Sequence, residues 1–172
     1  MIESFTFDHT TVEYIPYVRL SKALRTSGKN HLLKFDVRIK RPNGGDYLNP
    51  KVIHTLEHMF SVELEKYIDD TNATYFDFSP MGCQTGFYLS FIVDTENINH
   101  SPGYINIMES YVASIMNVVC IRILGNKSYK TDIPFANEIQ CGNYKLFDLD
   151  ESIKVVKELE GKFKAFGDKG ND

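Results

Sequence analysis

Cysteine is scarce in this sequence. The 172-residue chain contains only three cysteines, Cys83, Cys120 and Cys141, and they lie far apart. An odd number of isolated cysteines argues against a disulfide framework and favours free thiols in a reducing compartment. We therefore expect a cytoplasmic protein, in which an important cysteine acts as a thiolate or as a metal ligand.

Clustered basic charge and long apolar runs are also lacking. The 19 Lys and Arg residues are scattered among 23 Asp and Glu residues, and the formal net charge is -4. We therefore expect no nucleic-acid partner, because no basic face is available for a phosphate backbone. The longest apolar run, residues 87–93, is far shorter than the roughly 20 residues of a membrane helix, and residues 1–8 lack the features of a signal peptide. We expect no membrane association.

Apolar residues recur at the spacings of both strands and helices. The chain length fits one domain, which we assign to residues 1–166, and residues 167–172 are expected to form a disordered tail because they have nothing to bury. Alternation at period two predicts strands, and spacing of three to four residues predicts helices. The predicted strands are residues 4–8, 33–39, 75–78 and 87–93, and the predicted helices are residues 50 to about 67–69, 102–121 and 150–166. This order predicts an α+β fold with an antiparallel sheet packed against helices.

The segment from Asn49 to Phe60 combines a clear helix start with reactive side chains. Asn49 is a good N-cap, and Pro50 is acceptable at the first helical position. His54 and His58 lie one helical turn apart, and Glu57 lies beside them. A surface helix with two partly exposed histidines is the simpler alternative. We favour a metal site, because this segment is largely apolar and imidazoles and a carboxylate are costly to bury without a partner.

A third ligand decides which kind of metal site this is. Cys141 lies in a polar segment next to a glycine, and one thiolate with two imidazoles leaves a tetrahedral metal one open position for water or substrate. Cys83, between Gly82 and Gly86, resembles a presented reactive thiol more than a ligand. Cys120 lies on an apolar helical stripe and is expected to be a small core residue.

Two other functional classes fit the same helix. His-x-x-Glu-His is the inverted form of the zinc peptidase motif, in which Glu57 would activate a zinc-bound water. A metallopeptidase would need a further helical acidic ligand, and the helix after Pro102 supplies only Glu109. A non-catalytic metal-binding domain would explain the ligands but would leave Cys83 without a role.

Three separate segments resemble the S-ribosylhomocysteine lyases, which make the autoinducer-2 precursor. They are His54-Thr55-Leu56-Glu57-His58, Ser79-Pro80-Met81-Gly82-Cys83-Gln84-Thr85-Gly86-Phe87-Tyr88 and Gln140-Cys141-Gly142. The resemblance runs in order from Glu3-Ser4-Phe5 to Leu149, so it covers most of the chain. It implies a homodimeric α+β enzyme with its active site near the subunit interface.

The resemblance also implies the metal and the reaction. The metal is iron(II), often replaceable by zinc or cobalt, held by His54, His58 and Cys141, whereas the ligand types alone would have indicated zinc. The reaction is cleavage of S-ribosyl-L-homocysteine to L-homocysteine and 4,5-dihydroxy-2,3-pentanedione, without a redox step. The metal would act as a Lewis acid, and Cys83 as a thiolate and Glu57 as a carboxylate would move protons. The carbonyl migrates along the ribose, and the thioether is then lost by β-elimination.

The substrate-binding residues that the resemblance implies are Ser4, His9, Arg38 and Asp77. Of these, Arg38 and Asp77 are suited to the carboxylate and the ammonium group of the homocysteine part. The alternative for all four is ordinary surface polarity, which is most serious for Ser4.

Two features depart from the family pattern, and neither involves a ligand or a proton shuttle. The region between Asp94 and Ile133 is longer than in typical members and could alter the dimer edge or substrate access. Phe147 stands where a His-Asp-Leu sequence is common, so any role of that histidine is in doubt here. His31 and His100 belong to no motif and are expected at the surface.

Overall fold

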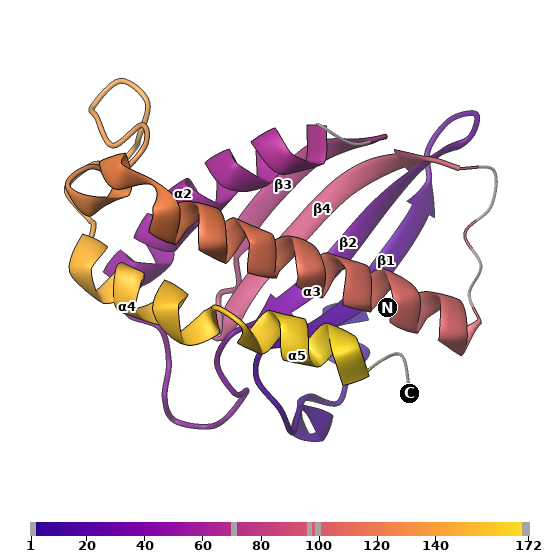
Figure 1. Cartoon of the computed structure of the whole chain (residues 1–172). Helices are drawn as coiled ribbons and strands as arrows, with labels where there is room; N and C mark the ends of the chain where they lie inside the picture. Colours follow the sequence, from indigo (N-terminus) through magenta and orange to yellow (C-terminus); the bar gives the residue numbers. More distant parts are fainter. Residues whose placement is uncertain (1–2, 70–71, 96–97, 99–100, 170–172) are drawn as a thin grey trace.

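A four-stranded antiparallel sheet with the order β1-β2-β4-β3 forms one layer of the molecule (Figure 1). The computed structural model describes residues 3–69, 72–95, 98 and 101–169. The strands are β1 (Tyr17–Arg25), β2 (Asn30–Arg38), β3 (Ala73–Pro80) and β4 (Gly86–Asp94). This arrangement confirms the predicted α+β fold and three of the four predicted strands.

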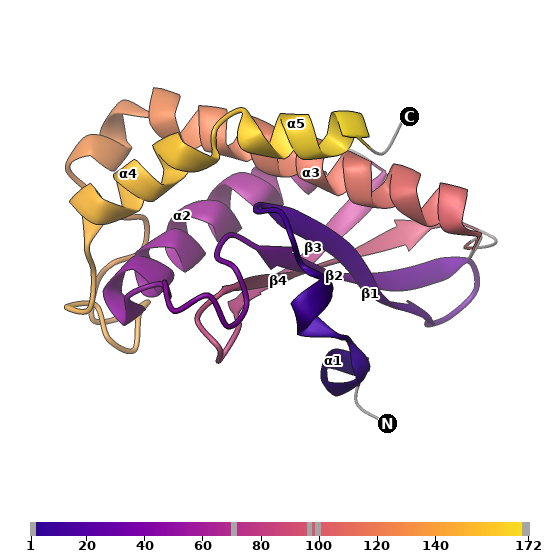
Figure 2. The same cartoon turned by 90° about the horizontal axis from the view of Figure 1, so that it is seen from below.

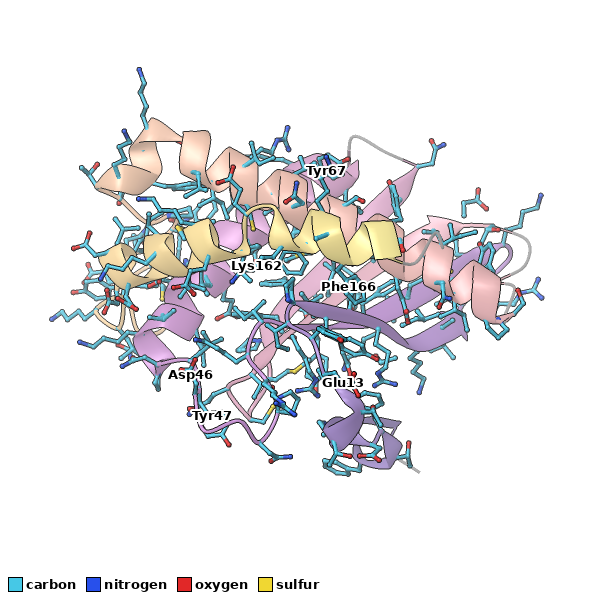
Figure 3. All side chains as sticks on the ribbon, turned by 60° about the horizontal axis from the view of Figure 1, so that its bottom comes forward. Glu13, Asp46, Tyr47, Tyr67, Lys162 and Phe166 are labelled. Carbon is cyan, nitrogen blue, oxygen red and sulfur yellow. The ribbon has the colours of Figure 1, made fainter. Side chains whose placement is uncertain are left out.

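The four longer helices lie on one side of the sheet, and the short N-terminal helix α1 lies on the other (Figure 2). The longer helices are α2 (Pro50–Asp69), α3 (Pro102–Gly125), α4 (Leu149–Leu159) and α5 (Lys162–Lys169). The short helical segments are α1 (Glu3–Thr6), η1 (His9–Thr11) and η2 (Lys127–Lys130). The predicted metal-binding helix therefore exists as α2, with the predicted start and end.

Alternating side chains of the central strands form the core between the sheet and the helices. Leu33, Phe35 and Val37 of β2 are buried, as are Leu89 and Phe91 of β4. The rings of Phe35 and Phe91 stack with their centroids 5.5 Å apart. Burying each side chain of this size contributes roughly 1.5–3 kcal/mol, so this face of the sheet holds the helices in place.

The opposite face of the sheet carries polar and charged side chains between the apolar ones. Arg19 of β1 forms an ion pair of 2.7 Å with Asp36 of β2, and the Lys34 ammonium lies 3.8 Å from the centre of the Tyr88 ring. Asp36 is nevertheless only 1% exposed. Neighbouring side chains therefore shield the Asp36 carboxylate from solvent, although none of the four longer helices covers this face (Figure 2).

Helix α3 is by length and composition apolar enough to cross a membrane, although no membrane segment was expected from the sequence. The core helix of a soluble protein passes the same test. Seven residues of α3 are buried here, among them Val112, Ile115 and Val119, and the helix belongs to the same hydrophobic cluster as the sheet. Part of its apolar surface is thus buried in this fold, whereas Ile107 and Ile121 are exposed.

The N-terminal strand prediction is wrong. Residues 3–6 form α1, and His9 begins the short helix η1. Alternation of Phe5 and Phe7 suggested a strand, but Phe5 is 83% exposed, so a strand here would have no buried apolar face to stabilise it. Asp8 instead caps η1, because its side chain accepts a hydrogen bond of 2.9 Å from the backbone N–H of Thr10, which favours a turn over a strand.

Other boundaries differ where local geometry intervenes. The helix predicted over residues 150–166 is divided into α4 and α5 at Gly161, whose φ of 78° ends a helix. Helix α5 extends to Lys169, into the segment expected to be disordered, and residues 170–172 lie outside the described residues. Residues 127–130, for which no element was predicted, form the short helix η2. His31 was expected at the surface but is only 7% exposed, and His100 lies outside the described residues.

Candidate active site

Helix α2 places the two histidines as the sequence predicted. The Asn49 side chain caps the helix, with its Oδ1 accepting a hydrogen bond of 2.9 Å from the backbone N–H of Lys51. The imidazole rings of His54 and His58 then meet edge to face, with centroids 4.8 Å apart. Both rings are half-buried. The helix start therefore fixes where the imidazoles lie.

Each imidazole is oriented by a backbone carbonyl from the C-terminal part of the chain. His54 Nδ1 lies 3.0 Å from the carbonyl oxygen of Leu146, and His58 Nδ1 lies 2.7 Å from that of Pro134. Because a carbonyl can only accept, each Nδ1 carries the proton and each Nε2 keeps its lone pair. Both rings therefore present a metal-binding nitrogen.

Cys141 completes a group of donor atoms that fits one metal ion. Its Sγ lies 3.4 Å from His54 Nε2, and the ligand atoms of His54, His58 and Cys141 all lie within 4.8 Å of one another. Donor atoms around one tetrahedral ion, with bonds of about 2.0–2.3 Å, are spaced by roughly 3.3–3.8 Å. Two nitrogen lone pairs and one thiol suit a borderline transition metal such as iron(II), zinc or cobalt. Of the three cysteines, Cys141 is thus the one at the predicted metal site.

Replacing Cys141 with alanine is expected to remove metal from the protein, because two imidazoles on one helix form a weak chelate without the thiolate. Metal content after dialysis against a chelator, measured by mass spectrometry, tests this. Cys120→Ala is the matched control, since Cys120 is fully buried in the core and belongs to no ligand group. If Cys141→Ala kept stoichiometric metal, the ligand assignment would be wrong.

Glu57 lies next to the histidines in a pocket of about 400 Å³. Burial raises the pKa of the Glu57 carboxyl above its ordinary value of 4.5, the nearby His54 and His58 oppose this, and the charge of Asp77 adds to it. A carboxyl with a raised pKa beside an open pocket is suited to proton transfer. The pocket is lined by Glu57, His58, Ser61, Val62, Glu65, Tyr75, Phe135 and Gln140.

The turn between β3 and β4 presents Cys83 to solvent. Backbone hydrogen bonds of 2.9 Å join Met81 to Gly86 and Gln84 to Met81. Gly86 pairs with Arg38 of β2, and a Cβ at this position would collide with the carbonyl oxygen of Val37. The glycine therefore allows the turn to close against β2, and the thiol of Cys83 is exposed as predicted.

Arg38 and Thr85 surround the thiol of Cys83. The Cys83 Sγ lies 3.1 Å from Thr85 Oγ1 and 3.7 Å from Arg38 Nη1. Burial acts to raise the pKa of the Cys83 thiol, but the hydrogen bonds from Thr85 and Arg38 and the charge of Arg38 outweigh it, so the pKa is below the ordinary 9.0. The positive charge of Arg38 therefore favours the thiolate form of Cys83.

Arg38 also connects this thiol to His9. Arg38 is 2% exposed, and its Nη2 donates a hydrogen bond of 2.9 Å to His9 Nε2. Because arginine has no acceptor, His9 carries its proton on Nδ1 and donates it to the Phe7 carbonyl at 2.9 Å. Cys83, Arg38 and His9 therefore form one connected group.

The two remaining predicted substrate residues have different surroundings. Asp77 in β3 accepts a hydrogen bond of 2.7 Å from the hydroxyl of Ser79, and its charge reaches Glu57. Ser4 lies in α1, and its side chain lies outside the described part of the structure. The roles of Ser4, His9, Arg38 and Asp77 toward a substrate stay predictions.

The predicted site residues thus fall into two groups. His54, His58, Cys141, Glu57 and Asp77 form the metal-side group, whereas Cys83, Arg38 and His9 form the thiol-side group. Among the residues that the structure describes, no hydrogen bond, ion pair or ring contact joins the two groups.

Several supporting residues had not been recognised in the sequence. Thr85 belongs to the segment around Cys83 that resembles the family, but its contacts with Cys83 and Arg38 depend on the closed turn. The Leu146 and Pro134 carbonyls have no sequence signal at all, because every residue has a carbonyl. Phe147 was noted only as a departure, and its ring in fact stacks on His54 with centroids 4.3 Å apart.

In the described part of the chain, the peptidase alternative lacks its acidic ligand. Glu109, the residue that it required, uses Oε1 to accept a hydrogen bond of 2.8 Å from the backbone N–H of Leu20 and is not part of the ligand group. The sequence model of the S-ribosylhomocysteinase (LuxS) family matches residues 2–166 of the 172-residue chain. That match includes every residue assigned above to the metal-side and thiol-side groups. The chain therefore belongs to the S-ribosylhomocysteinase (LuxS) family of carbon–sulfur lyases.

Proposed function

We propose that this lyase cleaves S-ribosyl-L-homocysteine to L-homocysteine and 4,5-dihydroxy-2,3-pentanedione, the autoinducer-2 precursor, in a metal-dependent reaction without redox chemistry. The observation that carries the proposal is the convergence of His54, His58 and Cys141 beside Glu57 in a chain that belongs to this family. In this proposal the enzyme works in the cytoplasm, where its free cysteines stay reduced.

The metal is iron(II) in this proposal, with zinc or cobalt as substitutes, and His54, His58 and Cys141 hold it. When bound, it supplies Lewis acidity that polarises an oxygen of the sugar. The donor set of two imidazole nitrogens and one sulfur supports this group of metals.

Proton transfer is the work of Glu57 and Cys83. The Glu57 carboxylate takes a proton from a sugar carbon next to the carbonyl and returns it to the neighbouring position, which moves the carbonyl along the ribose. The Cys83 thiolate serves as a second base on another step or on the other face of the sugar. Once the carbonyl reaches C3, removal of the C4 proton expels the homocysteine sulfur from C5, and the resulting enol becomes the diketone.

Substrate binding is assigned to Ser4, His9, Arg38 and Asp77. Arg38 is suited to the homocysteine carboxylate and Asp77 to its ammonium group. The pocket of about 400 Å³ beside Glu57 is large enough for the sugar.

Release of a free thiol tests this function. Purified protein loaded with iron(II), cobalt or zinc is incubated with S-ribosylhomocysteine, and homocysteine is followed with a thiol reagent. We expect turnover with metal and none after removal of the metal with a chelator, and peptides should stay uncut. Cleavage of peptides without homocysteine release would reject the proposal.

We further propose that the enzyme is a homodimer with its active site near the subunit interface. One face of the sheet is left open by the longer helices (Figure 2). Large apolar side chains are also exposed: Phe135, which lines the pocket beside Glu57, at 55%, Ile139 at 90% and Phe5 at 83%. Because the metal-side and thiol-side groups have no direct contact in one chain, a second copy offers a way to bring them together.

Mixing two inactive variants tests the shared site. If Glu57 of one subunit works with Cys83 of the other, a heterodimer of Glu57→Gln and Cys83→Ser contains one intact site. Random exchange of subunits should then restore about a quarter of wild-type activity. Light scattering at the assay concentration checks that the protein is a dimer. A fully active monomer would contradict the dimer, and a dimer that stays inactive after verified exchange would place both residues in one subunit.

A further inference from the structure

The segment Leu146–Asp148 is attached to helix α2 at two consecutive points. The Leu146 carbonyl accepts the hydrogen bond of 3.0 Å from His54 Nδ1. Two residues later, the backbone N–H of Asp148 donates a hydrogen bond of 2.9 Å to Thr55 Oγ1. Phe147, which lies between these anchors, therefore has little freedom to move away from the histidines.

The ring of Phe147 contacts both imidazoles. It stacks on His54, with centroids 4.3 Å apart and planes 21° apart, and it meets His58 edge on, with centroids 5.0 Å apart and planes at 83°. Such contacts favour particular ring orientations. Each histidine is thus held by a carbonyl at Nδ1 and by Phe147, and His54 Nε2 is left to face the Cys141 sulfur.

The hydroxyl of Thr55 is oriented to accept the hydrogen bond from the segment Leu146–Asp148. Thr55 is fully buried, and its hydroxyl donates a hydrogen bond of 2.8 Å to the carbonyl of Lys51. With its proton used in this way, Oγ1 is free to accept from the Asp148 N–H. Asp148 in turn caps α4, since its side chain accepts from the backbone N–H of Glu151 at 3.1 Å. The attachment is therefore supported from both sides.

We propose that Phe147 is a positioning residue for the metal ligands and that Thr55 holds Phe147 in place. The pair fixes the planes of His54 and His58 so that both Nε2 atoms face Cys141 without rearrangement. This inference rests on the proposed function, because it concerns the same metal site. Outer residues that orient metal-bound histidines typically contribute 10- to 100-fold to metal affinity.

The first test compares Thr55→Val with Thr55→Ser. Valine keeps the shape of threonine but has no hydroxyl, whereas serine keeps the hydroxyl. Cobalt-loaded protein is mixed with an excess of chelator, and cobalt release is followed by absorption. We expect release about 10- to 100-fold faster for Thr55→Val and close to wild type for Thr55→Ser.

The second test compares Phe147→Leu with Phe147→Tyr and does not depend on the folding of the Thr55 variants. Leucine is apolar but cannot stack, whereas tyrosine keeps the ring. The cobalt d–d absorption bands should shift for Phe147→Leu and stay in place for Phe147→Tyr. Thermal unfolding measured in parallel separates this effect from a general loss of packing, which would leave the bands of the folded protein unchanged.

The outcomes distinguish this inference from the proposed function. If wild-type protein cleaves S-ribosylhomocysteine and holds cobalt, but Phe147→Leu and Thr55→Val release cobalt at the wild-type rate with unshifted bands, the positioning role is wrong and the function stands. A wild-type protein that holds no cobalt, iron(II) or zinc would overturn both.

Discussion

Turnover of S-ribosylhomocysteine is expected to fall by about 10² to 10⁴ when Glu57 is replaced by glutamine, with the metal still bound. Glutamine keeps the size and hydrogen-bonding reach of glutamate but cannot take up a proton near neutral pH. The loss corresponds to roughly 3 to 5 kcal/mol of activation free energy. Initial rates of homocysteine release, with metal content measured on the same sample, give the result.

Glu158→Gln is the matched control for this variant. Glu158 is exposed near the end of α4 and does not line the pocket beside Glu57. It should turn over at the wild-type rate, because the same change of charge then lies away from the histidines. Wild-type turnover by metal-loaded Glu57→Gln would remove Glu57 from the mechanism.

Replacing Cys83 with serine is expected to cause a loss of similar size, about 10² to 10⁴ in rate, by a different route. Serine keeps the shape of cysteine, but its hydroxyl is far too weakly acidic to supply an anion. In the proposed mechanism the active form is the thiolate, so the rate should rise with pH as the thiol ionises. Since Thr85 and Arg38 lower the pKa of Cys83, this rise should lie below pH 9.0.

The pH profile and the intermediates separate Cys83 from Glu57. The residual activity of Cys83→Ser should lack the thiol-dependent rise. If the two residues act on different steps, at least one variant should accumulate a keto-sugar that still carries homocysteine, visible by carbon NMR with labelled substrate. A Cys83→Ser enzyme with bound metal, a wild-type rate and an unchanged profile would show that the thiolate is not needed.

Much of the site was predictable because it depends on local spacing. The positions of His54, His58 and Glu57 follow from the period of one helix, and Asn49 marks where that helix starts. Exposure of Cys83 follows from the short connection between two strands with clear alternation. These features are properties of neighbouring residues, so the sequence carries them directly.

Other features depend on what the chain meets only after folding. Strand β1 was not assigned, since its alternation is interrupted by an irregularity between Leu20 and Lys22 and it is an edge strand with exposed residues. Residues 4–8 alternate but have no strand to pair with. The supporting carbonyls of Leu146 and Pro134 come from positions 92 and 76 residues after the histidines that they orient, and no local pattern reports such distances.

The long separation between His54 and Cys141 also affects how firmly the chain is held together. These two ligands lie 87 residues apart in sequence, and a metal bound to both would tie α2 to the segment that precedes α4. If the metal stays bound, it lowers the conformational entropy of the unfolded chain, as a covalent cross-link does. By the chain-entropy estimate used for a disulfide, closing a loop of this length is worth about 4 to 5 kcal/mol. In the proposed holoenzyme the metal would thus also close a loop of about half the chain, and it would stabilise the fold in this way as long as it stayed bound during unfolding.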